Sequence, residues 1–263
     1  RDPRNNVSRY EYDERHRLTK ILAPLGSSTS LVYNDAGELT DMVDAEGRTT
    51  NYVYDDAGRL VELRLPGQSA TPIVYEYDTA SNLRFVNDQL DREMELQYDD
   101  RHRLVAEILP PPDPEAENQR PSTTYTYFAD GQLESVTETL LIYEFGELLY
   151  PITRTTDYAY DAAGRLASVT TPNGSGVPTQ VWDYEFDPFG NLAQAIDPLG
   201  NRTEYTYDTL PRLIQVKGED PDDNETTSDT NRPPTDYVYD VAGQLLEVTE
   251  KLADSSYRTS SYV

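Results

Sequence analysis

A tandem repeat constrains the fold of this chain more than any other feature. The pattern is Tyr-x-Tyr-Asp-x-x-Gly-Arg-Leu-x-x-Val, and its clearest copies begin at Tyr52, Tyr158 and Tyr237. Where the copies follow one another most closely, as from Asp13 to Asn34 to Asp55, they lie 21 residues apart. Ten copies align, with the Asp position at Asp13, Asn34, Asp55, Asp78, Asp99, Phe128, Asp161, Asp187, Asp208 and Asp240, and with Leu five residues later in every copy. A period of this length indicates a repeat architecture and is therefore considered before any local structure.

Each copy predicts a β-hairpin. Two tyrosines at positions i and i+2 lie on the same face of an extended strand. Asp-x-x-Gly is typical of a turn, since Asp caps backbone amides and Gly accepts a positive φ. The repeat Leu and the apolar residue three places later have opposite parity, so a strand can bury both only with a bulge between them. A second turn, as at Asp44–Gly47 and Asp197–Gly200, closes each unit about ten residues after the first.

The fold class expected from these units is all-β, a continuous antiparallel meander of about twenty strands. So many strands exceed one small barrel, and the sheet is expected to curl or spiral. The chain is also long enough to bury a substantial core. His16, Ser81, His102 and Pro211 stand at the Gly position, and because Pro cannot take a positive φ, the turn at Asp208 is expected to differ in type. Asp91, at the equivalent place in a second turn, is acceptable there because Asp visits the left-handed region readily.

The repeat resembles the YD repeat of the Rhs family, which includes bacterial Rhs polymorphic toxins, the C components of Tc toxin complexes, wall-associated proteins and teneurins. The resemblance covers roughly Tyr10 to Val248. It implies tandem YD β-hairpins in a spiralling antiparallel sheet that forms a segment of a hollow shell. In the bacterial members such a shell sequesters a C-terminal toxin, and in teneurins it serves cell–cell adhesion.

The domain organisation expected is a single YD-repeat array over residues 1–263, with loop insertions near 109–121, 138–156 and 217–235. The autoproteolytic core segment and the toxin domain of the family are not found in the sequence. Asp197-Pro198-Leu199-Gly200 resembles the processing motif, but it falls on a turn of the repeat and is interpreted as a turn. We therefore expect a segment of a longer protein, with a further strand near Tyr257 and Tyr262.

Composition excludes several classes of function. The chain has 48 acidic and 22 basic residues, a net charge of −26, which argues against a protein that binds nucleic-acid phosphates. It has no cysteine, and it lacks an apolar run of about 18 residues, so neither disulfides nor membrane insertion is expected. Arg1-Asp2-Pro3 is not a signal peptide. From the family resemblance we expect a bacterial protein that is secreted or at the cell surface.

Three insertions leave alternatives open. Pro110–Glu115 is interpreted as a stiff exposed spacer, with recognition by a proline-reading domain as the alternative. Gly218–Glu225 concentrates carboxylates, and the choice at Asp220–Glu225 lies between a solvated loop, which we favour, and a bound calcium ion. Leu140–Tyr150 favours an extra or lengthened hairpin over a short helix or a partner-contact patch.

The sequence indicates no catalytic, cofactor-binding or metal-binding residue, and no cofactor is expected. His16 and His102 lie within Arg-His-Arg and have no recurring serine or cysteine beside them. The recurring Asp–Arg pairs, such as Asp55 with Arg59 and Asp161 with Arg165, are interpreted as surface ion pairs of little energetic value. Regular tyrosine positions favour stacked aromatic ladders over a sugar-binding surface.

The function expected is a non-enzymatic scaffold, part of a shell that encapsulates or presents a cargo. The partner is then a cargo or toxin domain of the same parent protein, and an acidic lining would favour a basic one. The alternative is a cell-surface adhesion or carbohydrate-binding module, whose partner would be a cell-surface protein or a glycan bound at an exposed aromatic patch near Trp182 or Tyr143. An enzyme would require a pocket with convergent polar groups.

Overall fold

The computed structural model describes residues 7–24, 26–67, 71–113, 119–144, 147–172, 179–218, 234–251 and 256–262. These residues form 21 strands of one sheet and contain no helix, which confirms the all-β prediction. Every pair of strands whose register is defined is antiparallel, and it joins strands that are consecutive along the chain.

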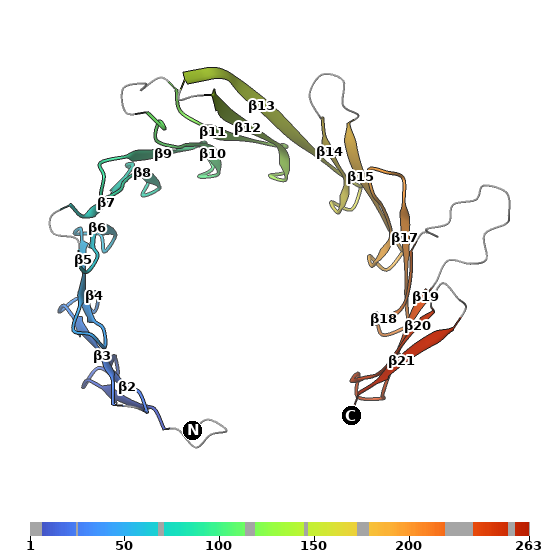
Figure 1. Ribbon diagram of the computed structural model, residues 1–263, viewed down its shortest axis with the longest axis horizontal. Coiled ribbons are helices and arrows are strands. Elements are labelled where there is room, and N and C mark those ends of the chain that lie inside the picture. The colour runs from blue at the N-terminus through green and yellow to red at the C-terminus, as the bar shows by residue number, and fades with distance from the viewer. Residues whose placement is uncertain are drawn as a thin grey trace. The chain divides into compact units, whose positions relative to one another are not determined.

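The chain divides into two compact units. The first contains residues 1–124 and 139–152, and the second contains residues 125–138 and 153–263. Within each unit the strands follow one another in chain order (Figure 1).

The first ten strands are β1 (Arg9–Tyr12), β2 (Leu18–Leu22), β3 (Ser28–Tyr33), β4 (Leu39–Val43), β5 (Thr49–Tyr54), β6 (Leu60–Arg64), β7 (Ile73–Tyr77), β8 (Leu83–Asn87), β9 (Glu93–Tyr98) and β10 (Leu104–Ile108). The remaining eleven are β11 (Ser122–Tyr127), β12 (Leu133–Glu144), β13 (Glu147–Tyr160), β14 (Leu166–Thr171), β15 (Gln180–Phe186), β16 (Leu192–Ile196), β17 (Arg202–Tyr207), β18 (Leu213–Lys217), β19 (Pro234–Tyr239), β20 (Leu245–Lys251) and β21 (Tyr257–Ser261).

The repeat positions set the strand boundaries. The odd-numbered strands from β1 to β19 end at the Tyr or Phe before the Asp position, and the even-numbered strands begin at the repeat Leu. β21 begins at Tyr257, as predicted.

The predicted bulge is confirmed. In the β5–β6 hairpin Tyr54 lies opposite Leu60 but Val53 lies opposite Glu62, which leaves Val61 as the extra residue. The same shift occurs in the nine repeat hairpins whose register is defined. The bulge turns the apolar residue after it back to the face of the tyrosines, so that Tyr52 lies opposite Leu63.

The turns combine a β-turn with one residue of positive φ, a common hairpin connection. The N–H of Gly58 donates to the carbonyl of Asp55 (3.0 Å), the N–H of Asp55 donates to the carbonyl of Arg59 (2.9 Å), and Gly58 has φ +77°. His16, Ser81, Asp91 and His102 take φ between 60° and 69° at this position.

The turn at Asp208 departs less than predicted. Asp208 caps the N–H of Leu210 (2.8 Å) and of Arg212 (3.0 Å), as in the other turns. Pro211 takes φ +23°, so the expectation that proline cannot take a positive φ here is wrong. Because proline lacks an N–H, it cannot make the bond that Gly58 makes. The prediction of a different turn is therefore wrong for the carboxylate contacts and holds only for this one hydrogen bond.

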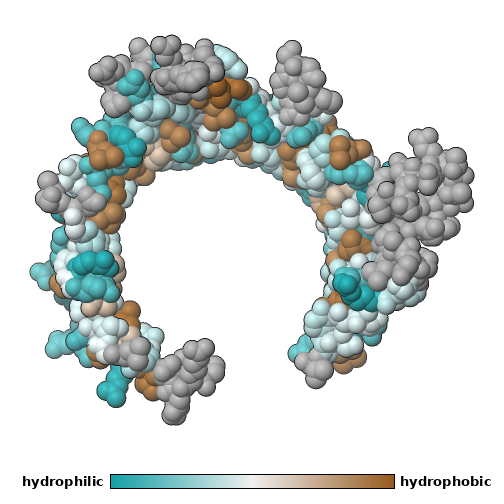
Figure 2. All heavy atoms as spheres, in the orientation of Figure 1, coloured by the Kyte–Doolittle hydropathy of each residue, from teal (hydrophilic) through white to brown (hydrophobic). Residues whose placement is uncertain are grey.

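The faces of the strands alternate in exposure. From the second copy onward, the residue between the two aromatic or apolar positions is exposed, as Val53 is, while its neighbours Tyr52 and Tyr54 are half-buried. Among the described residues only Ala106, Thr50 and Thr171 are buried. The prediction of a substantial core is therefore wrong, because a sheet with no second layer against it cannot remove side chains fully from water. Hydrophobic residues remain visible at the surface (Figure 2).

The structure describes parts of two of the three insertions. β12 and β13 are 12 and 14 residues long, so the described residues on either side of 145–146 form long strands, as a lengthened hairpin requires, and not a short helix. Residues 109–113 form a loop, in which Pro110 and Pro111 are half-buried rather than exposed. The rest of the proline segment and the acidic segment Asp220–Glu225 lie outside the described residues.

Candidate functional site

The polar residues of the repeat gather at the hairpin turns, where an Asp carboxylate holds the backbone. Asp55 Oδ1 accepts from the N–H groups of Ala57 (2.9 Å) and Arg59 (3.0 Å). Asp55 Oδ2 accepts from Arg59 Nε (2.8 Å) and Nη2 (2.6 Å). Both oxygens are thus occupied by structural contacts within their own turn.

The same turn closes the opposite ends of the hairpins. Asp44 caps Glu46 and Arg48 and pairs with Arg48 Nε at 2.7 Å. Asp197 caps Leu199 (2.8 Å) and Asn201 (2.9 Å), and Gly200 has φ +90°, so the segment that resembles the processing motif is a turn.

These contacts lower the pKa values of the capping carboxyls. Hydrogen bonds from the Arg59 side chain and then from its backbone N–H hold the pKa of Asp55 below its ordinary value of 3.8. The backbone N–H of Arg17 is the largest cause of the lowered pKa of Asp13. Each bond favours the ionised carboxylate, so these groups stay charged at neutral pH.

The turn arginine also contacts the next copy of the repeat. The guanidinium carbon of Arg59 lies 4.6 Å from the ring centroid of Tyr77, and Arg59 Nη1 donates to Ser81 Oγ (3.0 Å). The Tyr77 hydroxyl donates in turn to the carbonyl of Leu60 (2.9 Å). We call this arrangement of the capping Asp, the turn Arg and the next copy's aromatic residue the Asp–Arg–Tyr clasp.

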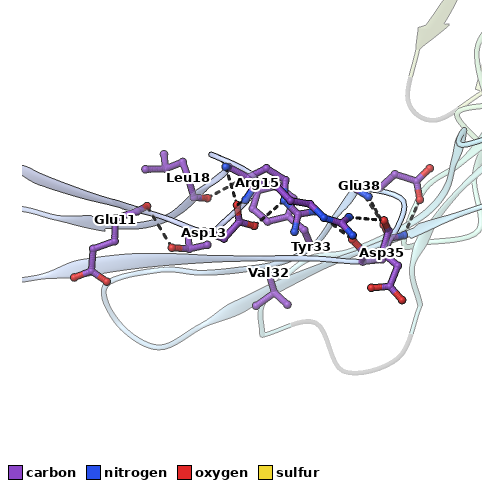
Figure 3. Close-up of polar contacts among 12 residues, drawn as sticks. Glu11, Asp13, Arg15, Leu18, Val32, Tyr33, Asp35 and Glu38 are labelled. Atoms are coloured by element: carbon purple, nitrogen blue, oxygen red, sulfur yellow. Dashed lines mark hydrogen bonds and ion pairs between the residues drawn. The ribbon is translucent and has the colours of Figure 1, made fainter.

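The clasp recurs in both units. In the first unit Arg17 lies over Tyr33 (4.7 Å), and the Tyr33 hydroxyl donates to the carbonyl of Leu18 (2.9 Å; Figure 3). In the second unit Arg212 lies over Tyr239 (5.0 Å) and donates to the carbonyl of Asp240 (3.1 Å).

At one clasp the aromatic residue is a phenylalanine. Arg165 lies over the Phe186 ring at 4.5 Å and donates to the carbonyl of Asp187 (3.4 Å). The stacked guanidinium therefore does not require the hydroxyl group.

Arginine occupies its position in alternate copies. The residues there are Arg17, Glu38, Arg59, Asn82, Arg103, Gln132, Arg165, Asn191, Arg212 and Gln244. Two of the uncharged side chains also contact the next copy: Asn82 Oδ1 lies 3.1 Å from His102 Nδ1, and Gln132 Nε2 donates to the carbonyl of Gly164 (2.7 Å). From the sequence alone, the Asp–Arg pairs are interpreted as isolated ion pairs. The alternation of arginine along the aligned copies is the sequence signal that could have indicated a contact between copies.

The tyrosines form a different ladder from the one predicted. The half-buried rings do share one face of the strands, as expected. Ring–ring stacking is not what joins them: among the described residues the one such contact is between Phe128 and Tyr160, at 6.1 Å and 86°. At the clasps an arginine side chain lies over the ring of the next copy instead. Burial raises the pKa of Tyr75 and Tyr98 above the ordinary value, consistent with a partly desolvated face.

The other residues singled out by sequence do not converge. His16 and His102 are turn residues with φ near +60°. Trp182 on β15 is 43% exposed and lies opposite Val169, while the side chain of Tyr143 lies outside the described part. Over the described ranges, no three His, Asp or Glu side chains lie close enough to hold a metal ion, and no helix could span a membrane.

Comparisons with known proteins identify the repeat. The sequence profile named RHS Repeat matches residues 33–70, 148–175 and 186–222. No curated protein sequence matches the chain. A mutant of the Photorhabdus luminescens Tc holotoxin pore is similar in structure, with a TM-score of 0.56 and 16% identity over 97% of this chain, which spans 14% of the length of that chain. The TcdB2–TccC3 structure without its hypervariable C-terminal region has a TM-score of 0.46 and 17% identity over 98% of this chain and 16% of its own.

The holotoxin structure supports the fold alone, because its sequence identity is low. The sequence profile matches copies of the repeat in both units. Residues 33–70, 148–175 and 186–222 are RHS repeats, and the resemblance to the Rhs/YD-repeat family that the aligned tyrosine, aspartate and leucine positions predict is confirmed.

Proposed function

We propose that this chain is a structural wall segment of an Rhs-type shell, which encloses or presents a cargo domain of its parent protein. The observation that carries the proposal is that the recurring polar groups of the repeat serve the fold. The Asp carboxylates cap turns, and the stacked arginines hold successive hairpins together. A chain built this way offers a continuous hydrogen-bonded surface rather than a set of reactive side chains.

The comparisons support the shell role and suggest the class of parent protein. The similar structure belongs to a Tc holotoxin pore, and the repeat profile is that of RHS repeats. A bacterial secreted protein is the parent that this likeness favours. With a net charge of −26, the wall would attract a basic cargo more strongly than an acidic one.

Limited proteolysis of the full parent protein tests the proposal. The rate of cleavage within the parent's other domains is measured by mass spectrometry, in the intact protein and in a version that lacks residues 1–263. Protection lost in the shortened protein, by about tenfold or more in cleavage rate, supports a shell, because an enclosed chain meets protease only after local opening. Equal cleavage rates in the two proteins would show that this chain encloses nothing.

One observation favours a second candidate, a carbohydrate-binding module. Trp182 is 43% exposed, and an exposed indole can stack on a sugar ring. A glycan array with the wild-type chain and the Trp182→Ala variant tests this function. Binding that disappears in the variant supports it, and an array without hits rejects it.

A further inference from the structure

The sixth repeat turn departs from the others at the position of the capping residue. Phe128 occupies the place of the capping Asp, and this residue is 37% exposed. Asp130, two residues later, caps the N–H of Gln132 instead (3.0 Å). Gln132 occupies the place that Arg fills in five other copies. The backbone of the turn is nevertheless regular, since Gly131 donates to the carbonyl of Phe128 (2.9 Å).

A pocket of about 410 Å³ lies at this turn, within the second unit. Its volume falls in the range of small-ligand sites, about 300–1,000 Å³. The Phe128 and Tyr160 rings meet edge to face in its wall. The residues that line it are Phe128, Ala129, Asp130, Gln132, Tyr160 and Asp161.

The clasps of the same unit show which group suits this environment. At the seventh and ninth turns a guanidinium carbon lies 4.5 Å from the Phe186 ring and 5.0 Å from the Tyr239 ring. Tyr160 is the equivalent ring at the sixth turn, and its preceding copy supplies a glutamine rather than an arginine. The ring of Tyr160 is thus present, but the sixth turn, which precedes it in the chain, carries Gln132 and supplies no guanidinium.

The charge at the pocket favours a cation. Asp161 is already paired with Arg165 (2.6 Å), whereas the Asp130 carboxylate caps a backbone N–H and forms no ion pair with any residue that the structure describes. An aromatic face attracts a cation, and a nearby carboxylate adds to that attraction. The planar guanidinium of arginine both stacks on a ring and forms forked hydrogen bonds with a carboxylate.

We propose that this pocket binds the guanidinium group of an arginine side chain presented by a partner. The bound group would take the position over the Tyr160 ring that Arg165 takes over Phe186. Asp130 would accept its hydrogen bonds, and Phe128 would cover one side of it. The chain's net charge of −26 would bring a basic segment to this surface.

Binding of a short peptide tests the proposal. The probe is acetyl-Gly-Arg-Gly-amide, and its control carries citrulline, which has nearly the same shape without the charge. Dissociation constants for the full chain are measured by NMR titration at about 150 mM salt, where long-range attraction is screened. We expect the citrulline peptide to bind at least about tenfold more weakly, because it lacks the cation that the ring and the carboxylate attract. Equal binding of the two peptides, or no binding of the arginine peptide, would overturn the proposal.

Three variants locate the site. Asp130→Asn should weaken arginine binding about fivefold, since the neutral amide can still cap the turn but cannot form an ion pair with the guanidinium. Asp56→Asn, which removes the same charge from an exposed turn of the first unit, should leave binding unchanged. Phe128→Asp combined with Gln132→Arg rebuilds the clasp within the chain, and it should abolish binding because the chain's own guanidinium fills the pocket.

The outcomes separate this site from general attraction to an acidic protein. An equal loss in Asp130→Asn and Asp56→Asn would contradict a local site, as would unchanged binding in the rebuilt clasp. Circular dichroism checks that the double variant folds. If it does not fold, the comparison of Asp130→Asn with Asp56→Asn decides the question by itself.

Discussion

Single residues in this protein serve two copies of the repeat at once. The Tyr77 ring faces Arg59, and its hydroxyl group donates to the carbonyl of Leu60 in the preceding copy. Phe186 keeps the stacked arginine without a hydroxyl group. The ring and the hydroxyl group therefore make separable contributions to the link between copies.

Tyr77→Phe and Tyr77→Leu measure these contributions. Tyr77→Phe removes one hydrogen bond and should lower the free energy of unfolding by about 1 kcal/mol. Tyr77→Leu also removes the ring beneath Arg59 and should cost about 1 kcal/mol more. Urea unfolding followed by circular dichroism gives both values. Equal stability of the two variants would show that the stacked arginine contributes nothing.

Two glycines with the same backbone angle separate conformational strain from crowding. Gly47 has φ +76° and open space where a Cβ atom would lie, whereas at Gly58, with φ +77°, a Cβ atom would lie 2.9 Å from Glu38 Oε1. Gly47→Ala should cost about 1 kcal/mol from the left-handed backbone alone. Gly58→Ala should cost the same amount plus the displacement of the Glu38 side chain. Thermal unfolding of the two variants gives the order, and a greater loss in Gly47→Ala would contradict it.

The pH dependence of one cap follows from its lowered pKa. The pKa of Asp55 is below 3.8 in the folded chain, so folding favours the ionised form. Its stabilisation is complete above the unfolded value and is lost as the pH falls through the lower folded value. The difference in melting temperature between wild type and Asp55→Asn should therefore be constant from pH 7 to about 5 and shrink below pH 3.8. A difference that persists undiminished at about pH 2 would contradict this assignment.

At the scale of elements, strand boundaries and bulges could be predicted because they depend on neighbouring residues. The repeat Leu begins each even-numbered strand up to β20, and the bulge follows from the parity of Leu60 and Leu63. The partner of Arg59 could not be predicted in the same way. Its contact with Tyr77 depends on how one hairpin lies against the next, which the local pattern does not specify.

The pocket at Phe128 escaped prediction for a similar reason. The sequence shows that Phe replaces Asp, but the space that opens beside Tyr160 depends on the position of both rings. The prediction for the turn at Pro211 overestimated the effect of proline. Asp208 keeps three contacts in this turn, and these outweigh the one hydrogen bond that proline removes.

One arginine holds the ends of the insertion after β10. Arg120 donates to the carbonyls of Glu93 (2.7 Å), Ile108 (3.2 Å) and Leu109 (2.9 Å). Arg120→Ala should leave these carbonyls without their donor and speed amide exchange in β10 by about tenfold, equivalent to the loss of one or two hydrogen bonds. Hydrogen–deuterium exchange with mass spectrometry measures the change.

Arg120→Lys is the matched control for this prediction. Lysine keeps the charge near Glu93 and Glu95, but it cannot reach three carbonyls with a planar fork. It should therefore give intermediate exchange. Exchange as slow as in wild type would show that charge alone holds the loop.

At the scale of the whole molecule, stability must come from contacts between neighbouring hairpins. Only three of the described residues are buried, so no central core joins distant parts of the described chain. Repeat proteins of this kind are stabilised by the sum of their units and of the interfaces between them. The net charge of −26 acts against this sum through repulsion among the carboxylates.

Salt should consequently stabilise the protein. Raising sodium chloride from about 10 to about 200 mM shortens the screening length and weakens repulsion across the acidic surface. The same salt weakens the turn ion pairs, but these are short and in direct contact, so the melting temperature should rise by several degrees. Potassium chloride should act equally, because screening depends on ionic strength and not on a particular cation. A melting temperature that falls with salt would show that the ion pairs outweigh the repulsion.

The alternation of arginine along the turns limits how such a chain can change in length. Removing or duplicating one hairpin would bring two guanidinium-bearing turns together, or two turns without one. Adding or removing hairpins in twos would preserve the order Arg17, Glu38, Arg59, Asn82. Engineered arrays with even-numbered insertions should therefore tolerate growth better than those with odd ones.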